Sequence, residues 1–234
     1  MAVQHRTALV SDFDGTVSDD DFFYYISRQY LSEKSLEPWR AYMEGKKTHF
    51  EALREIFASL RVKKADLDDF IRKIRIDRDF LKTAAWCQEQ QIPVYVCSAG
   101  CDYYINLLIG PEIAEYGIRL GANHGTYSSR HGLEMTPPPA DSRFYDPGTG
   151  VNKAAVVAYL HELGYRVVYC GDGMPDLAAA RIADWVFARK MLLRQCVNLG
   201  IPAVKLIDFE QVYRFLEGKN NEKTSALPNR QPSD

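Results

Sequence analysis

Five short apolar segments rich in β-branched residues alternate with longer helical stretches along the chain. They lie at residues 7–10, 92–97, 165–170, 184–188 and 203–207. Strands that alternate with helices predict an α/β fold with a mainly parallel sheet. In open sheets of this kind, ligands bind beyond the carboxyl ends of the strands. The residues that directly follow each strand are therefore the first candidates for a functional site.

A long helical region, residues 20–89, separates the first two strands, and its apolar residues recur at helical spacing. A crossover between parallel strands needs only one helix, whereas Pro38 and Gly45 divide this region into several. The surplus predicts a helical cap inserted after the first strand. The expected domains are a core at residues 1–17 and 90–218 and a helical cap at residues 18–89.

Residues 118–150 differ in character, being rich in Gly, Ser and Pro, with consecutive prolines at 137–139. This composition predicts a short β-excursion centred on residues 121–134, followed by an irregular loop. The chain ends in a polar segment, residues 219–234, which we expect to be disordered.

Charge and hydropathy restrict the partners of the chain. The 234 residues carry a formal net charge of -2, which gives no general attraction to nucleic acid or to an anionic membrane. No segment has the length of a membrane span or the apolar region of a signal peptide. The five cysteines are scattered and odd in number, as is typical of reduced proteins. We expect a cytoplasmic protein, a monomer or homodimer, whose partner is a small metabolite.

An acidic pair follows the first strand, in the run from Asp12 to Thr16 (Asp-Phe-Asp-Gly-Thr). One carboxylate of such a pair can attack phosphorus, while its neighbour protonates the leaving oxygen and later activates water. Gly15 allows the backbone to approach a phosphate closely, and Thr16 offers a hydroxyl and an N–H group. An isolated Asp-x-Asp is frequent in solvated turns, but Asp12 and Asp14 directly after an apolar strand form a more specific signal.

Complementary groups follow the next strands. Ser98, Ala99 and Gly100 precede a predicted helix, where a hydroxyl and free N–H groups can hold a phosphate oxygen. Asp172 and Asp176 offer the hard oxygen ligands that suit Mg²⁺. Lys153 adds a compact positive charge for the transferring group. These residues and the acidic pair predict a phosphoryl-transfer site at one rim of the sheet.

Other patterns in the chain favour structural roles. Residues 148–153 have the wrong spacing for a phosphate-binding P-loop. The five histidines show no paired metal-ligand spacing. The aromatic cluster at residues 22–25 favours packing inside the cap over a platform for stacking bases.

The ordered motifs resemble those of the haloacid dehalogenase superfamily. The first motif matches residues 12–16, the second Ser98, the third Lys153 and the fourth residues 171–176. This resemblance implies a Rossmann-like core and a phosphatase reaction, because the dehalogenase branch lacks the second aspartate of the first motif.

The same resemblance implies individual roles for the acidic residues. Asp12 would be the nucleophile and Asp14 the general acid/base. Mg²⁺ would be held by Asp12, by the backbone carbonyl of Asp14 and by Asp172, with Asp176 supporting the site.

Within the superfamily, the helical insertion resembles the cap of phosphoserine phosphatase-like members. A further likeness is to the methionine-salvage phosphatases that act on 2-hydroxy-3-keto-5-methylthiopentenyl-1-phosphate. It rests on residues 18–21, 123–124, 187–189, 192–193 and 196, and spans about residues 5–215. The loop at residues 144–150 departs from the cysteine-rich loop of that family.

We expect residues of the cap to bind the leaving group of the substrate. Phosphoserine phosphatases carry Glu where this chain has Asp21 and a cap arginine where it has Ile56. Arg54 is close in sequence and is a candidate substitute, so Asp21 and Arg54 are predicted substrate-binding residues. Phosphoserine phosphatase, a phosphotransferase, a receiver-type signalling module and a catalytically silent binding protein remain alternatives.

Overall fold

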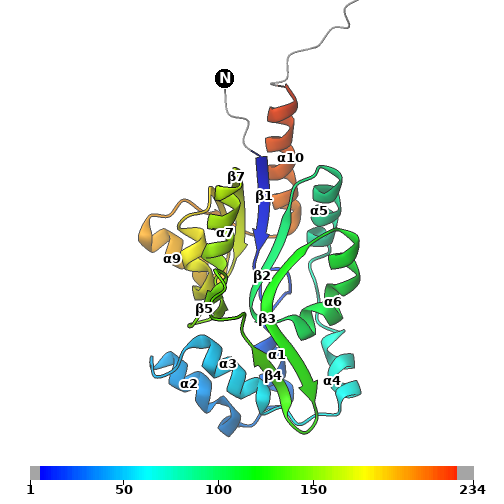
Figure 1. The fold of residues 1–234 in the computed structure, drawn as a ribbon, viewed down its shortest axis with the longest axis vertical. Coiled ribbons are helices and arrows are strands. Elements are labelled where there is room, and N and C mark those ends of the chain that lie inside the picture. Colours follow the sequence, from blue (N-terminus) through cyan, green and yellow to red (C-terminus); the bar gives the residue numbers. More distant parts are fainter. Residues whose placement is uncertain (1–5, 226–234) are drawn as a thin grey trace, which may run out of the picture.

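A seven-stranded sheet forms the centre of the molecule in the computed structural model, which describes residues 6–225 (Figure 1). The strand order is β4-β3-β2-β1-β7-β8-β9, and every neighbouring pair is parallel except β3 and β4. The strands are β1 (Arg6–Ser11), β2 (Val94–Cys101), β3 (Arg119–Ser128), β4 (Gly132–Thr136), β7 (Tyr165–Gly171), β8 (Trp185–Ala188) and β9 (Val204–Lys205). A separate antiparallel pair consists of β5 (Tyr145–Asp146) and β6 (Gly150–Val151). The α/β class with a mainly parallel sheet is confirmed.

Helices cover both faces of the sheet, because the central strands are apolar on both sides. Leu9 and Val168 belong to one buried cluster, whereas Ala8 and Val167 belong to the other. This division follows the two-residue period of a strand. The first face carries α5 (Arg78–Glu89), α6 (Asp102–Glu115) and α10 (Phe209–Ser225). The second carries α7 (Lys153–Glu162), α8 (Leu177–Ala180) and α9 (Lys190–Leu199).

Between β1 and β2, the chain forms a group of helices that lies beyond the carboxyl ends of the strands (Figure 1). They are α1 (Phe22–Gln29), the 3-10 helix η1 (Glu33–Leu36), α2 (Glu37–Met43), α3 (His49–Ala58) and α4 (Lys64–Ile71). Thr48 and Glu51 form a capping box that starts α3. The amide of Phe50 donates a 2.8 Å hydrogen bond to the carbonyl of Gly148, which ties α3 to the loop that precedes α7.

The ends of this helical group meet at a short β-bridge between Ser18 and Ile76. Helix α5 packs instead against α10, where the rings of Phe80 and Phe209 lie 5.0 Å apart. We therefore propose that the cap ends near Ile76, and that α5 belongs to the core, in place of the expected span of 18–89.

The β-excursion expected at residues 121–134 is present as a β3–β4 hairpin. Its first strand also extends the main sheet, since Val96 pairs in parallel with Leu120. The expectation of a disordered tail from residue 219 needs correction, because α10 remains helical through Ser225. Residues 226–234 of the expected disordered tail lie outside the described residues.

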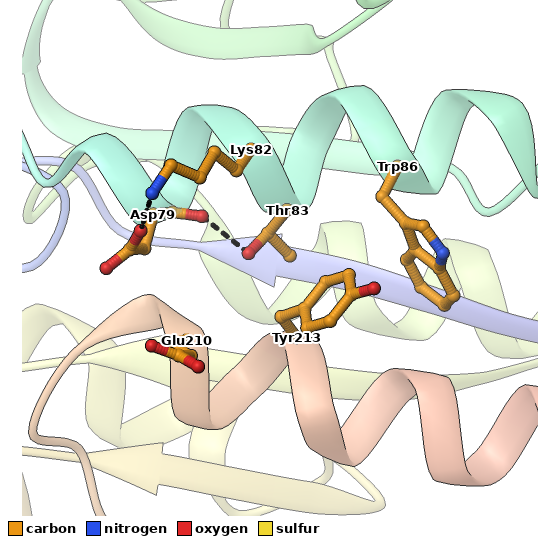
Figure 2. A pocket seen from close by; sticks show the side chains of 6 residues that line it. All are labelled: Asp79, Lys82, Thr83, Trp86, Glu210 and Tyr213. Carbon is orange, nitrogen blue, oxygen red and sulfur yellow. Dashed lines mark hydrogen bonds and ion pairs between the residues drawn. The ribbon is translucent and has the colours of Figure 1, made fainter.

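The outer surface between α5 and α10 has a groove of about 400 Å³ (Figure 2). The rings of Trp86 and Tyr213 lie 5.1 Å apart along it, and Lys82 pairs with Asp79 at 2.6 Å.

Within residues 6–225, no helix has the length and apolar character needed to cross a membrane.

Candidate active site

The chain leaves β1 in a tight turn that presents Asp12 and Asp14. The amide of Asp12 donates a 2.9 Å hydrogen bond to the carbonyl of Cys170, so this residue still follows the strand. The carbonyl of Phe13 then accepts from the amides of residues 16, 17 and 18. Gly15 has a φ of +67°, and a Cβ there would lie 2.2 Å from Oδ2 of Asp172. Only glycine suits this backbone conformation and this close approach.

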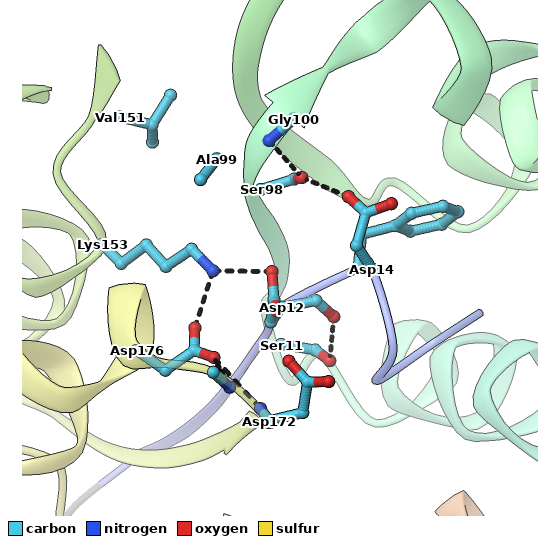
Figure 3. Close-up of polar contacts among 12 residues, drawn as sticks. Ser11, Asp12, Asp14, Ser98, Ala99, Gly100, Val151, Lys153, Asp172 and Asp176 are labelled. Atoms are coloured by element: carbon cyan, nitrogen blue, oxygen red, sulfur yellow. Dashed lines mark hydrogen bonds and ion pairs between the residues drawn. The ribbon is translucent and has the colours of Figure 1, made fainter. Parts of the chain in front are cut away.

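Lys153 bridges two carboxylates at the centre of the site (Figure 3). Its Nζ lies 2.6 Å from Oδ1 of Asp12 and 2.6 Å from Oδ1 of Asp176. Lys153 is the first residue of α7, and the side chain of Asn152 caps this helix through the amide of Ala155. The Lys153 side chain is 3% exposed. Because burial of an unpaired charge is costly, its two ion pairs are essential to its position.

Asp176 fastens the loop that follows β7. Its Oδ2 accepts hydrogen bonds from the amides of Asp172 at 3.0 Å and Gly173 at 2.9 Å. Its Oδ1 also accepts from the hydroxyl of Tyr169 at 2.7 Å. With Lys153 as a fourth partner, Asp176 holds the loop and the lysine together.

The carboxylate of Asp14 points away from this lysine. Its Oδ2 accepts hydrogen bonds from Oγ of Ser98 at 2.9 Å and from the hydroxyl of Tyr104 at 2.6 Å. Its Oδ1 accepts from the amide of Phe22 at 3.1 Å. All three donors favour the ionised carboxylate.

The segment from Ser98 to Gly100 lies at an irregularity in β2, where the pairing with β3 shifts register. Such irregularities re-aim side chains next to active sites. Gly100 donates its amide to Oγ of Ser98 at 2.9 Å, and a Cβ on Gly100 would lie 1.6 Å from the Tyr104 hydroxyl. The side-chain amide of Asn123 donates to the carbonyls of Ala99 and Gly100 at 2.9 and 3.0 Å, which fixes this backbone from β3.

These groups surround a cavity of about 70 Å³. The core contributes the residues named above, and the helical group contributes Asp21 from the start of α1 and His49, Leu53 and Phe57 from α3. The full lining is Asp12, Asp14, Asp21, His49, Leu53, Phe57, Ser98, Ala99, Gly100, Tyr104, Lys153, Asp172, Gly173, Pro175 and Asp176.

The close packing of charges shifts the ionisation of this site. Burial, followed by the charge of Asp176, raises the pKa of Asp12 well above its usual value, and Lys153 opposes this effect. Burial alone would lower the pKa of Lys153, but Asp12 and Asp176 outweigh it and raise that pKa. Burial also raises the pKa of Asp14 and Asp172. Added positive charge would therefore be needed to keep every carboxylate ionised.

The acidic groups fit a divalent cation. Oxygen atoms of Asp12, Asp172 and Asp176 lie within 4.8 Å of one another. Oxygen donors at such spacing suit Mg²⁺. Asp176 already accepts three donors besides the Asp172 amide, so it supports this cluster. Asp12 and Asp172 each pair one carboxylate oxygen, with Lys153 and with Lys190, and keep the other without a partner among the described residues. The carboxylate of Asp14 is outside the cluster, consistent with a role for its backbone carbonyl alone.

The structure places most of the predicted residues around this cavity, with three exceptions. Gly15 lies outside the lining but next to the side chain of Asp172. Thr16 is fully buried, and its Oγ1 has no hydrogen-bond partner among the described residues. Arg54 is exposed on α3 and lies over the ring of Phe50 at 5.6 Å, so the structure does not bring it to the cavity. Its position follows from helical geometry, because Arg54 is one residue away from the Leu53 stripe that faces inward.

Sequence reasoning missed Tyr104 and His49. Tyr104 lies near the start of α6, shortly after Ser98 in the chain, and reaches Asp14 only after folding. His49 stands four and eight residues before Leu53 and Phe57, so it belongs to one helical stripe with them. This spacing could have indicated His49, but only if that face of the helix were already known to line a site.

Comparisons with known proteins show what the chain is similar to. Residues 9–181 match the family model of haloacid dehalogenase-like hydrolases. The chain is 30% identical, over 91% of its length and 96% of the relative, to a 2-hydroxy-3-keto-5-methylthiopentenyl-1-phosphate phosphatase from Geobacillus kaustophilus (strain HTA426). It is 25% identical to a polyol phosphate phosphatase from Saccharomyces cerevisiae (strain ATCC 204508 / S288c), covering 88% of this chain and 91% of that one.

A solved structure of a substrate-bound phosphoserine phosphatase has a similar fold. The TM-score is 0.63 at 17% identity, and the match covers 90% of this chain and 98% of that one.

Proposed function

The chain belongs to the haloacid dehalogenase-like hydrolases, and from this premise we propose that it is a Mg²⁺-dependent phosphatase of small phosphate monoesters. The observation that carries the proposal is the Lys153 bridge between Asp12 and Asp176 in the cavity that also holds Asp14. A receiver-type module would need neither the long helical insertion after β1 nor the acidic turn at residues 171–176.

In the first step, the carboxylate of Asp12 attacks phosphorus in line with the ester oxygen. The phosphorus–oxygen ester bond breaks, and protonated Asp14 gives its proton to the departing oxygen. Lys153 and the Ser98 hydroxyl stabilise the negative charge on the transferring phosphoryl group. The product is an aspartyl-phosphate at Asp12 and a free alcohol or enol.

In the second step, water replaces the leaving group. Asp14, now ionised, takes a proton from this water as its oxygen attacks the phosphorus of the aspartyl-phosphate. The bond to Asp12 breaks, inorganic phosphate departs, and both carboxyl groups return to their starting states. The ionised state of Asp14 fits the donors around it, namely Ser98, Tyr104 and the Phe22 amide.

Asp12 and Asp172 would hold Mg²⁺, with Asp176 supporting them, and the ion would neutralise phosphate charge and keep Asp12 ionised. Gly15 is needed for this arrangement, because any side chain there would collide with Asp172.

For the substrate, we propose 2-hydroxy-3-keto-5-methylthiopentenyl-1-phosphate, on the basis of relatives that are named for this activity. Phosphoserine is less favourable, because its carboxylate needs a cation and Arg54 is exposed away from the cavity. Transfer of the phosphoryl group to an alcohol instead of water depends on which acceptor enters the same cavity.

The test is a kinetic comparison of purified protein with this compound, phosphoserine and a polyol phosphate. We expect phosphate release in Mg²⁺ that EDTA abolishes and fresh Mg²⁺ restores, with the highest kcat/KM for the methylthiopentenyl ester. A higher kcat/KM for phosphoserine would replace the proposed substrate, and metal-independent turnover would contradict the proposed cofactor.

A further inference from the structure

His49 is a polar side chain in the helical wall of the cavity that the phosphoryl-transfer steps do not use. It is the first residue of α3 and lines the cavity together with Leu53, Phe57 and the catalytic carboxylates. The residue is partly buried, and its Nδ1 is fully buried with no hydrogen-bond partner among residues 6–225. A buried polar atom without a partner costs free energy, so a ligand atom that meets His49 would recover part of that cost.

The surroundings of His49 keep its ring in place and uncharged. The rings of Trp39 and Tyr42 meet it edge-on at 5.8 and 5.4 Å. Burial, and then the charge of Lys153, lowers the pKa of His49 to about 4. At neutral pH the imidazole therefore has one N–H donor and one acceptor nitrogen, and it forms hydrogen bonds with uncharged groups rather than ion pairs.

The rest of the wall also favours an uncharged leaving group. Among the residues that line the cavity in the described part of the chain, Lys153 is the one permanent cation, and it is already paired with Asp12 and Asp176. Asp21 and the apolar side chains of Leu53 and Phe57 complete the wall. Lys190 lies outside this lining and pairs with Asp172 at 3.0 Å. A carboxylate on the leaving group would thus meet no unpaired cation on the cavity lining.

The size of the cavity determines which part of a substrate His49 can reach. Since one water needs about 10–15 Å³ of such space, a cavity of about 70 Å³ holds a phosphoryl group and only the first atoms of its leaving group. With the phosphoryl group beside Asp12 and Lys153, the leaving-group atoms next to the ester oxygen remain for contact with the α3 wall.

We propose that His49 is a specificity-determining residue that hydrogen-bonds an uncharged oxygen on the carbon next to the phosphoester carbon. The substrate class is accordingly small phosphate monoesters with a hydroxyl or carbonyl at that position. This inference rests on the proposed phosphatase function, and it narrows the leaving group that the function accepts. Both a 2-hydroxy-1-phosphate and a polyol phosphate, as in the names of two relatives, have such an oxygen.

The experiment compares two substrates that differ in this oxygen alone, glycerol 1-phosphate and 3-hydroxypropyl phosphate. For the wild-type protein in Mg²⁺, we expect kcat/KM to be about 10- to 100-fold higher for glycerol 1-phosphate, the usual effect of one buried hydrogen bond. His49→Leu should remove most of this preference by slowing glycerol 1-phosphate and leaving 3-hydroxypropyl phosphate nearly unchanged. His49→Gln, which keeps a donor and an acceptor, should retain part of the preference.

Arg54→Gln is the matched control on the exposed face of α3, and we expect it to keep the wild-type ratio. Equal rates of the wild-type protein with both esters, or an equal loss with both in His49→Leu, would overturn the role of His49. So would turnover of p-nitrophenyl phosphate without turnover of either aliphatic ester. If His49→Leu does not fold, the wild-type ratio and His49→Gln decide the question. Absence of turnover with every ester would instead refute the proposed function.

Discussion

The hydroxyl of Tyr104 donates a 2.6 Å hydrogen bond to Oδ2 of Asp14, joining residues 90 positions apart. The ring of Tyr104 is buried and stacks on Phe22 with centroids 4.2 Å apart. Since Phe22 also donates its amide to Asp14, these two residues link the orientation of the acid/base carboxylate to the start of α1. The position of the helical group therefore affects the acid/base step through the orientation of Asp14.

Replacing Tyr104 with Phe should change the pH dependence of turnover. The Tyr104 hydrogen bond lowers the pKa of Asp14 against the dominant effect of burial, so its loss raises that pKa further. Because Asp14 must be protonated to assist leaving-group departure, the alkaline limb of kcat/KM for an alkyl phosphate should move to higher pH. Tyr103→Phe is the control, since the Tyr103 hydroxyl bonds Asp68 instead. An unchanged limb, or a shift to lower pH, would contradict the role of Tyr104.

Replacing Gly15 with Ala should damage both the fold and the site. A Cβ at Gly15 would lie 2.2 Å from Oδ2 of Asp172 and 2.5 Å from Nζ of Lys190, so we expect kcat to fall at least about 100-fold through displacement of Asp172. Gly45→Ala separates strain from collision, because Gly45 also has a positive φ of +73° but nothing within 4 Å of its added Cβ. That control should lose about 1–2 kcal/mol of stability and keep its activity. Equal activity losses in the two variants would contradict the collision argument.

Replacing Lys153 with Met should destabilise the metal-free protein by about 3 kcal/mol, because it leaves two buried carboxylates without their shared cation. Mg²⁺ should restore part of this loss in chemical denaturation, since it supplies positive charge to the same group. Lys82→Met, which breaks the exposed pair with Asp79, should have little effect. A loss in Lys153→Met that is no larger than in this control would show that the bridge does not stabilise the fold.

The lowered pKa of His49 predicts that the protein loses stability in mild acid. Its folded-state pKa of about 4 lies below the ordinary value of 6.5, so the unfolded chain binds a proton that the folded protein does not, and stability falls as pH drops below about 6.5. Between pH 7.5 and pH 5, this contribution amounts to about 2 kcal/mol. The wild-type protein should lose about that much more unfolding free energy than His49→Leu over this interval, measured by urea denaturation in EDTA. His131→Leu, at an exposed histidine, should behave as the wild type does, and identical pH profiles for all three proteins would refute the prediction.

Local sequence predicted the centre of the site, because strands that pair in parallel end at the same edge of the sheet. Ser11 pairs with Val96 on one side and with Cys170 on the other, so the residues that follow these strands necessarily meet at one rim. The order of the strands in the sheet could not be predicted from local sequence. Residues 121–134 were expected only as a separate β-excursion, yet the first half of β3 pairs in parallel with β2, because β2 extends to Cys101.

The wall that faces the leaving group was the least predictable part. Arg54 and His49 both lie on α3, and a charge seemed the better candidate for contact with a substrate. The helix turns Arg54 outward because its apolar stripe packs inward, and His49 shares that stripe with Leu53 and Phe57. Tyr104 needed the tertiary structure, since no local spacing connects it with Asp14.

The most direct test of the central claim is the turnover of p-nitrophenyl phosphate in Mg²⁺ by Asp12→Asn. Asparagine is nearly the same size but is not a nucleophile, so we expect kcat to fall at least about 1,000-fold with the fold retained in circular dichroism. Asp141→Asn, at an exposed position, should keep wild-type turnover. Near wild-type turnover by Asp12→Asn would contradict Asp12 as the nucleophile.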